Sequence, residues 1–430
     1  MTTRQIPRYT LRCRQCGKEL SDDGLVLTHA GCDPPALLQT IYAAEKPESI
    51  GDLTGIFRYG NWLPLRRTFP QSSAAVTYRS EKLACRLGLD NLFITFNGYW
   101  PERNAFMRTC SFKELEAYAV CARLPDHFRD VLVIASAGNT ARAFIHVCSA
   151  YRIRALIVVP EWSLPMLWQE REHNNCVRVV AVGGGSDYAD AISLAESICG
   201  MDGFVAEGGA LNVARRDGLG TTVLSCTTQA GRIPDEYFQA VGSGTGAIAA
   251  WETSVRLSQN NVFSGGPMRL HVSQNLPFAP IYESWAHRSR RLVSVDSSSG
   301  FACARPYADV LFNRRPPYSI AGGVYDALCA TNGHAYGITS KEAIAAAYLF
   351  EETEGIDIDP AAAVAVACLV NCAAEGKVRR NAFVMLNITG GGLNRLKQDA
   401  VLQTAKPLTV IDPSEFKNFC SSLVRDGLWP

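Results

Sequence analysis

Lys113 stands directly after Cys110, Ser111 and Phe112, at the start of a helical pattern in the segment MRTCSFKELEA. Lysine favours helices, and most lysines in such positions face water. A lysine that is desolvated near other cations instead loses basicity, becomes a nucleophile and can take up and return a proton. Lys113 is therefore our first candidate for covalent chemistry, and a solvated surface lysine is the alternative.

Three loops of small residues follow strand-like runs and are candidates for ligand binding. SAGNT (136–140) lets a ligand approach the backbone closely, and GSGTG (242–246) offers backbone N–H groups at a helix start, which suits a phosphate. LNITGGGLNRL (386–396) places Thr389 at a strand end before three glycines. Each loop alone is more often a tight turn. GSGTG lacks the acidic residue of a dinucleotide site and the Gly-Lys-Ser/Thr of a Walker loop, so both are disfavoured.

Four possible metal ligands lie near the amino terminus with the spacing C-x2-C-x12-H-x2-C: Cys13, Cys16, His29 and Cys32. This spacing is close to that of a small zinc ribbon, and Gly17 permits a tight turn after the first pair. Cys32 lacks a following glycine, so a cysteine-bearing hairpin without metal is the alternative. A bound metal would be structural, because four protein ligands leave no open position for substrate.

The elements that must position these residues alternate regularly from about residue 76 onward. Strand-like runs end in Gly, Asn or Pro and are separated by helical patterns; they occupy residues 92–98, 131–139, 155–160, 177–184 and 237–246. This alternation predicts parallel sheets covered by helices on both faces, and ligands bind at the carboxyl ends of such strands.

The composition is that of a globular enzyme-sized chain. The 430 residues suit two or three domains, with 47% hydrophobic and 19% charged residues and a net charge of +1. The charge gives no sign of a nucleic-acid or membrane partner. The start lacks the apolar core of a signal peptide, and the run at 361–374 is too short to span a bilayer and predicts a buried helix. Scattered single cysteines fit a reducing compartment, so we expect a cytoplasmic protein.

Taken in order, the candidate motifs resemble one enzyme family. SFKE (111–114), SAGNT, GSGTG and Thr-Gly-Gly-Gly (389–392) are similar to the pyridoxal-phosphate enzymes of the tryptophan synthase β fold, fold type II, and most of all to threonine synthase and its relatives. The amino-terminal cysteine element also occurs in several threonine synthases.

Longer stretches narrow the resemblance to the cysteate synthases, which are paralogues of threonine synthase. The resemblance extends over nearly the whole chain; its clearest segments are VTYRSEKLACRLGL, GYWPERNAF, TCSFKELEA, FQAVGSGTG, QNLPFAPIY and PPYSIAGGVYDAL. Residues 109–114 read Thr-Cys-Ser-Phe-Lys-Glu where a threonine synthase usually reads Thr-Gly-Ser-Phe-Lys-Asp. That departure counts against threonine synthase itself.

The resemblance implies an α/β fold of two doubly wound domains with mainly parallel sheets, besides the small amino-terminal Cys/His ribbon-like element. We expect the ribbon-like element at residues 1–50, a smaller domain with Lys113 and the SAGNT loop at 51–215, and a larger domain with the phosphate loop at 216–430. Some exchange of segments between the two domains is expected.

The resemblance also implies a pyridoxal 5′-phosphate site. Lys113 would form the Schiff base with the cofactor, Asn139 would bind its 3′-oxygen and Thr389 its ring nitrogen. The alternatives are a turn asparagine and a β-branched strand-end residue. The cofactor phosphate would lie in the loop formed by Gly242, Ser243, Gly244, Thr245 and Gly246.

The implied reaction is a β-replacement by a transferase: O-phospho-L-serine and sulfite give L-cysteate and phosphate, in coenzyme M biosynthesis. Ser136, Gly138 and Thr140 would hold the substrate carboxylate. The anionic substrates also require cations. Candidates are Arg103 and Arg108 near Lys113, Arg79 and Lys82 in the segment TYRSEK, and Arg215 with Arg216 in the segment NVARRDG; Arg108 is favoured because it is near Lys113 in sequence.

Other functions stay open. A threonine synthase would use O-phosphohomoserine and water, and an O-phosphoserine sulfhydrylase would use sulfide. A catalytically silent relative would bind ligands only, although it would not need Lys113, Asn139, the glycine loop and Thr389 together. We expect a homo-oligomer of unknown order.

Overall fold

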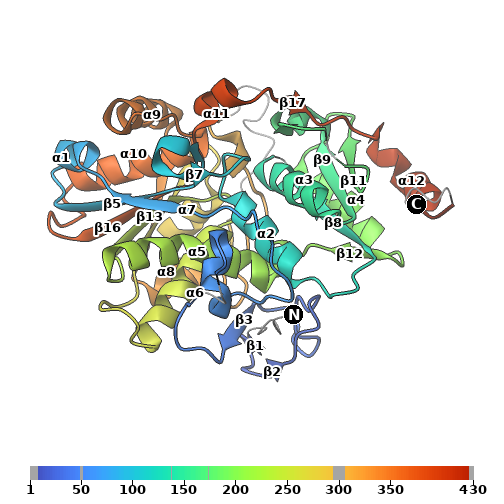
Figure 1. The fold of residues 1–430 in the computed structure, drawn as a ribbon, viewed down its shortest axis with the longest axis horizontal. Helices are drawn as coiled ribbons and strands as arrows, with labels where there is room; N and C mark the ends of the chain where they lie inside the picture. The colour runs from blue at the N-terminus through green and yellow to red at the C-terminus, as the bar shows by residue number, and fades with distance from the viewer. Residues whose placement is uncertain (1–7, 49–51, 137, 173, 294–305, 426–430) are drawn as a thin grey trace.

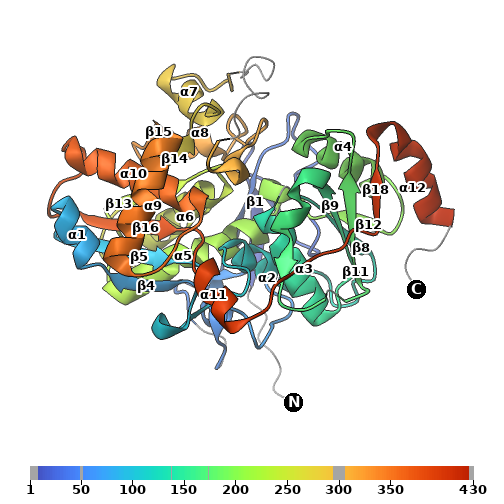
Figure 2. The same cartoon turned by 90° about the horizontal axis from the view of Figure 1, so that it is seen from above.

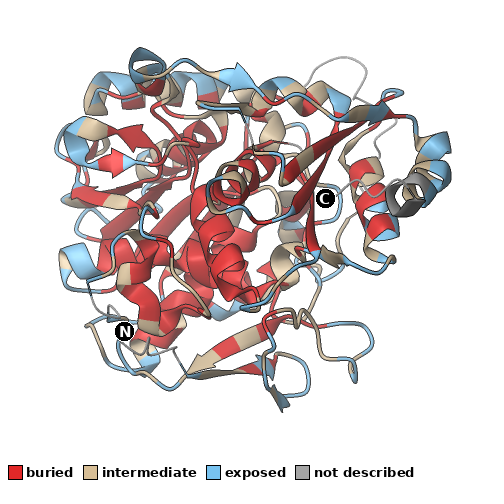
Figure 3. Ribbon diagram, turned by 45° about the vertical axis from the view of Figure 1, so that its right-hand side comes forward, coloured by how far each residue is buried: buried red, intermediate tan, exposed pale blue. Residues whose placement is uncertain are grey.

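A computed structural model describes residues 8–48, 52–136, 138–172, 174–293 and 306–425. Within these ranges the chain forms two sheets side by side, with the helix that begins at Lys113 between them (Figures 1 and 2). Buried residues fill the interior of both halves, while exposed residues lie mainly on outward helix faces and loops (Figure 3). The α/β class with mainly parallel sheets is confirmed.

The larger sheet has six strands, parallel except at one edge. In spatial order they are β15 (His334–Ile338), β14 (Arg269–Asn275), β13 (Glu236–Ala240), β16 (Phe383–Ile388), β5 (Asn91–Phe96) and β4 (Val76–Arg79), with β4 antiparallel to β5.

Helices cover both faces of the larger sheet, because successive side chains of a strand point to opposite sides. Phe238 packs toward α9 (Ser340–Glu354) and α10 (Pro360–Ala374), whereas its neighbour Tyr237 packs toward α5 (Val213–Ala230) and α6 (Thr245–Gln259). The apolar run 361–374 is a buried part of α10, as predicted.

The smaller sheet has five parallel strands. In spatial order they are β12 (Phe204–Ala206), β8 (Val131–Ala135), β9 (Ala155–Pro160), β11 (Val177–Val182) and β18 (Thr409–Ile411). One face packs against α2 (Lys113–Arg123) and α3 (Asn139–Tyr151), and the other against α4 (Tyr188–Cys199) and α12 (Phe416–Arg425). Strands buried on both faces explain the continuous apolar runs of the sequence.

The amino-terminal residues form a separate three-stranded antiparallel sheet with the order β2 (Glu19–Leu20), β1 (Tyr9–Cys13) and β3 (Leu38–Tyr42). It lies at the bottom of Figure 1, next to α5. The expected small Cys/His element is therefore present.

Segments exchange between the two halves. Strands β4 and β5 belong to the larger sheet although they precede α2 in sequence, and β18 returns from the carboxyl-terminal part to the smaller sheet. The division at residues 50 and 215 stays a prediction. Among the helices in the described ranges, none is both long and apolar enough to cross a membrane.

Helices α2 and α5 cross at close range because Gly218 has no side chain. A Cβ atom at Gly218 would lie 2.7 Å from Ala119 Cβ and 2.8 Å from the Leu115 carbonyl oxygen. This close approach places the start of α2 beside Arg215 of α5.

We expect Gly218→Val to lower the free energy of unfolding by about 1–3 kcal/mol, since the extra carbons overpack a backbone contact. Urea unfolding would measure the change. Gly266→Val is the control, because a Cβ at that position meets no atom within 4 Å. Equal effects of the two substitutions would contradict the assigned role of the α2–α5 contact.

Candidate active site

A cavity of about 330 Å³ lies where strands of both sheets end and three helices begin. Its lining includes most of the site residues predicted from the sequence: Lys113, Ser136, Gly138, Asn139, Thr140, Arg215, Gly242, Ser243, Gly244, Thr245, Gly246 and Thr389. Strands β8, β13 and β16 each end just before one of the lining loops. The cavity therefore occupies the position at which doubly wound sheets bind ligands.

Lys113 is the first residue of α2 and its side chain reaches the cavity. Burial lowers the pKa of its ammonium group, with Arg215 acting in the same direction and Glu116 against it. The lysine Nζ lies 3.1 Å from Glu116 Oε2. A lower pKa increases the fraction of neutral amine, the form that acts as nucleophile or base.

Glu116 is fully buried one turn after Lys113 and joins three helices. Its Oε1 accepts a hydrogen bond from the Thr140 hydroxyl at 2.9 Å and lies 3.1 Å from Arg215 Nη1. Arg215 also pairs with Glu207 through Nε at 2.9 Å and through Nη2. Burial alone would lower the pKa of Arg215, but Glu116 and Glu207 outweigh it and the pKa is raised. The charge of Arg215 is thus compensated by buried carboxylates.

Asn139 is held in one orientation by two charged neighbours. Its Oδ1 accepts from Arg142 Nη2 at 2.9 Å, and its Nδ2 donates to Asp359 Oδ2 at 3.3 Å. If the amide were reversed, its N–H groups would face the donors of Arg142 and its oxygen would face the carboxyl of Asp359, and both hydrogen bonds would be lost. The second N–H of Nδ2 stays available for a ligand oxygen. Burial raises the pKa of Asp359 to about 6, although Arg142 and Asn139 lower it.

The SAGNT loop is shaped by its own hydroxyl groups. Ser136 Oγ accepts hydrogen bonds from the N–H groups of Gly138 at 3.2 Å and Ala141 at 3.0 Å, so this hydroxyl folds the turn. Thr140 donates its hydroxyl to Glu116. Residue 137 lies outside the described residues. The loop therefore offers a substrate mainly the first backbone N–H groups of α3.

The GSGTG loop ends in the first turn of α6, with Gly244 as N-cap at φ 79°. The first N–H groups of a helix have no partner within the helix, which favours an anion there. The other glycines also satisfy packing: a Cβ at Gly242 would lie 3.0 Å from the Leu311 carbonyl oxygen, and one at Gly246 would lie 2.5 Å from Gln239 Nε2. Glycine at these positions therefore serves both the close packing of the loop and the open space for an anion.

Thr389 is connected directly to the segment that carries Lys113. Its carbonyl oxygen accepts from the Phe112 N–H at 2.9 Å, and Ser111 pairs with Gly390 in an isolated antiparallel bridge. The buried threonine follows the last residue of β16. This bridge fixes the strand end relative to the start of α2.

The residues present fit pyridoxal phosphate. The described lining combines an amine, an amide, a hydroxyl group at a strand end and backbone N–H groups at a helix start, of which that of Thr245 donates to Ser243 Oγ at 3.3 Å, and it contains no carboxylate. Such a donor set suits a phosphorylated, anionic group.

Of the candidate cations, only Arg215 is among the described residues that line this cavity; Arg79, Lys82, Arg103, Arg108 and Arg216 are not. Arg108 lies on Tyr99, pairs with Glu170 at 3.2 Å and lines a different cavity. Arg103 stacks over Tyr78 and Trp100. The chain turns at Cys110, which has a φ of 48°, so closeness to Lys113 in sequence is not closeness in space.

Other residues of the site were not found from the sequence: Glu116, Tyr188, Glu207, Arg315 and Asp359. Glu116 could have been found from the sequence, because it follows Lys113 by three positions and residues three apart in a helix lie on the same face. The remaining residues reach the site only through the packing of separate segments, and no local pattern marks them.

The chain is similar to known pyridoxal-phosphate dependent enzymes over most of its length. The family model described as pyridoxal-phosphate dependent enzyme matches residues 89–390. Cysteate synthase of Methanosarcina acetivorans is 44% identical over 409 residues, covering 94% of this chain and 97% of the relative. Cysteate synthase of Methanoculleus marisnigri is 46% identical over 394 residues, covering 91% and 90%.

Solved structures show the same fold at low sequence identity. Maize serine racemase has a TM-score of 0.59 and 14% identity, covering 76% of this chain and 91% of that chain. Threonine deaminase isoform 2 of Solanum lycopersicum has a TM-score of 0.55 and 19% identity, covering 75% and 82%. On the near full-length similarity and the family match, the chain belongs to the cysteate synthase family of pyridoxal-phosphate dependent enzymes.

Proposed function

We propose that this protein is a transferase that converts O-phospho-L-serine and sulfite to L-cysteate and phosphate, a reaction of coenzyme M biosynthesis. In the reaction the bond between Cβ and the phosphate oxygen breaks and a bond between Cβ and sulfur forms. The observation that carries the proposal is the cavity in which Lys113, Asn139, the GSGTG loop and Thr389 meet, with no carboxylate among the described residues that line it.

Pyridoxal phosphate, when bound, supplies the electron sink that makes the α-proton of the amino acid acidic. The N–H groups from Gly242 to Gly246 would hold its phosphate, Asn139 its 3′-oxygen and Thr389 its ring nitrogen. A neutral hydroxyl group at the ring nitrogen does not hold that nitrogen protonated, which favours elimination and replacement over transamination.

Lys113 Nζ takes the proton from Cα of the substrate and later returns it to the same carbon. Burial and Arg215 favour the neutral amine, and Glu116 stabilises the ammonium form that exists between the two transfers. A general base works best when its protonated and neutral forms are similar in stability. For Lys113, the opposing effects of Arg215 and Glu116 bring the two forms closer together.

The substrate carboxylate would be held by the backbone N–H groups at Gly138–Thr140, where α3 begins. Arg215 is already paired with Glu116 and Glu207, so we assign it to holding Glu116 in place and not to binding an anion. Arg315 lines the same cavity, is exposed, and has no ion pair with any described carboxylate. We therefore assign the leaving phosphate and the entering sulfite to Arg315.

Homo-oligomerisation and a cytoplasmic location are part of the proposal. The described cysteines are all free thiols, which fits a reducing compartment. Ile344 and Tyr348 are exposed one turn apart on α9 and form an apolar strip that suits contact with a second copy.

Lys113→Ala should abolish covalent attachment of the cofactor and lower kcat by about 10²–10⁴-fold, the range that general acid–base groups contribute. Borohydride reduction of the cofactor-loaded wild type, followed by peptide mass spectrometry, should locate the pyridoxyl group on Lys113. Lys82→Ala is the matched control, since Lys82 also begins a helix but is exposed. A wild-type protein that takes up no cofactor would instead indicate a catalytically silent relative.

Arg315→Ala should raise KM for O-phosphoserine by about tenfold or more, because a charge-assisted contact worth roughly 1.5–3 kcal/mol is lost. Steady-state kinetics would measure it. Arg314→Ala is the control: this neighbouring arginine pairs with Asp187 at 3.0 Å and is absent from the cavity lining. Arg108→Ala should also leave KM unchanged. The same KM in Arg315→Ala and wild type would remove Arg315 from the site.

Turnover of three substrate pairs should separate the related reactions. We expect rapid product formation from O-phosphoserine with sulfite, and much slower formation from O-phosphoserine with sulfide or O-phosphohomoserine with water. Amino-acid analysis of each mixture gives the comparison directly. Sulfite-dependent cysteate as a minor product would overturn the proposed function in favour of a sulfhydrylase or a threonine synthase.

A further inference from the structure

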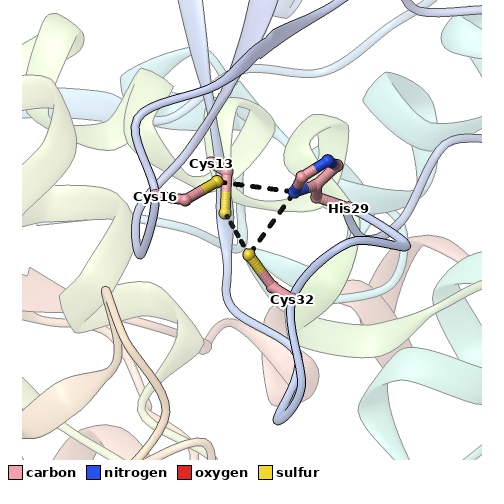
Figure 4. Close-up of side chains that lie close together, drawn as sticks. All are labelled: Cys13, Cys16, His29 and Cys32. Atoms are coloured by element: carbon pink, nitrogen blue, oxygen red, sulfur yellow. Dashed lines mark hydrogen bonds between the residues drawn. The ribbon is translucent and has the colours of Figure 1, made fainter.

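The side chains of Cys13, Cys16, His29 and Cys32 converge at one point outside the proposed active site, although they come from two separate turns (Figure 4). Cys13 Sγ lies 3.6 Å from Cys32 Sγ, and His29 Nδ1 lies 3.4 Å from both Cys16 Sγ and Cys32 Sγ. The four ligand atoms all lie within 4.8 Å of one another.

The three contacts of 3.4–3.6 Å are close to the ligand separations of a tetrahedral metal site. With metal–sulfur bonds of ~2.3 Å and metal–nitrogen bonds of ~2.0 Å, tetrahedral ligands lie roughly 3.5–3.8 Å apart. A disulfide would require two sulfurs at ~2.05 Å, which excludes one between Cys13 and Cys32 in this arrangement. Three soft thiolates and an imidazole select zinc over magnesium or calcium.

The backbone of both turns is built to bring these ligands together. In the first turn, the Gly17 N–H donates to the Cys13 carbonyl at 2.9 Å, and Gly17 adopts a φ of 74°. In the second, the Cys32 N–H donates to the His29 carbonyl at 3.1 Å. A Cβ at Gly31 would lie 2.9 Å from the His29 ring, so a larger residue there would displace the imidazole from this position. In the first turn the glycine, Gly17, follows the second cysteine, whereas in the second turn the glycine, Gly31, precedes Cys32.

We propose that Cys13, Cys16, His29 and Cys32 bind one structural Zn²⁺ ion, and that this ion holds in place the loops that border the active-site cavity. The first part rests on the ligand geometry alone. The second part rests on the contacts that the segments between the ligands make with the rest of the chain.

The segment between Cys16 and His29 holds the far end of α2. Asp22 accepts from Arg123 through both oxygens, at 2.8 and 2.7 Å, and the Val26 carbonyl accepts from the same guanidinium at 2.7 Å. Arg123 is buried and is the last residue of the helix that begins with Lys113. It also donates to Asn212 Oδ1 at 3.0 Å.

The same segment packs against a loop of the cavity wall. A Cβ at Gly208 would lie 2.5 Å from Leu27 Cδ2, so the leucine lies directly on this glycine. The neighbouring Gly209 and Ala210 line the cavity, and Glu207 is the partner of Arg215.

The first metal-binding turn contacts a second cavity loop. Arg14, between the first two cysteines, stacks over Trp251 at 4.6 Å and packs against Gly322. The Leu37 N–H donates to the Ala321 carbonyl at 3.0 Å. Residues 310–313, 315 and 317 of the preceding connection line the cavity. Without the metal, the two turns that make these contacts would no longer be joined to each other through a shared ion.

Metal analysis tests the first part. The purified protein should contain about one zinc per chain, and the cobalt-exchanged protein should show the strong visible bands of tetrahedral Co²⁺ and thiolate-to-cobalt charge transfer. Cys16→Ser should lose the metal, whereas Cys85→Ser, at an exposed thiol elsewhere, should keep it. His29→Cys should keep it with the spectrum of a four-sulfur site. If Cys16→Ser does not fold, the cobalt spectra of the wild type and of His29→Cys still show whether these residues bind the metal. Wild-type protein without stoichiometric zinc, whose metal-free form takes up neither Zn²⁺ nor Co²⁺, would overturn the proposal.

Chelation tests the second part on the cofactor-loaded protein. Removing zinc should lower the melting temperature, expose the segment 17–31 to trypsin, and raise KM for O-phosphoserine between about twofold and thirtyfold, the range of measured couplings between distant sites. Adding zinc back should reverse all three changes. Unchanged KM after complete removal of zinc would refute the coupling. Melting and proteolysis do not depend on the reaction, so they report on the metal even if the proposed substrates are wrong.

Discussion

A buried carboxylate, Glu116, is the interaction on which the arrangement of the site depends. An ionised carboxylate away from water is stable only when it is paired and hydrogen-bonded. Its partners come from three helices: Lys113 from its own helix α2, Thr140 from the start of α3 and Arg215 from α5. The need to satisfy one charge therefore fixes the relative positions of the lysine, the SAGNT loop and the wall formed by α5.

The same pairing decides which groups remain for ligands. Arg215 is paired with both Glu116 and Glu207, and Lys113 with Glu116, so neither side chain is left as an unpaired cation. The attraction for anions then comes from backbone N–H groups at the starts of α3 and α6 and from Arg315 at the cavity. Backbone donors do not titrate, so most of the anion binding is independent of pH, while the amine of Lys113 keeps the freedom to exchange a proton.

The sequence predicted the elements and the residues at strand ends well, because both depend on local patterns. Apolar runs marked the buried strands, and the ends of parallel strands must meet, so Asn139, the GSGTG loop and Thr389 converge as expected. Arg108 precedes a left-handed residue, Cys110, pairs with Glu170 and lines another cavity, which its closeness to Lys113 in sequence does not reveal. Glu207 and Arg315 could not be found, since they reach the cavity only after distant segments pack together. The fit of α2 on α5 at Gly218, which brings Arg215 to Glu116, is likewise invisible to any local pattern.

The amino-terminal element illustrates why a metal and a catalytic domain would be linked in one chain. Among the described residues, the element contributes four to its buried cluster, Leu11, Cys13, Ala36 and Leu38, which pack with Val213 of α5. So few apolar residues do not fold a separate unit, and small domains of this kind depend on metals or on a neighbour. This element has a neighbour, because Asp22, Arg14 and Leu27 lie against the body, and its turns carry the four ligands of the proposed metal. An element that needs the body for its own stability also restrains the parts of the body that it touches, and those parts border the cavity.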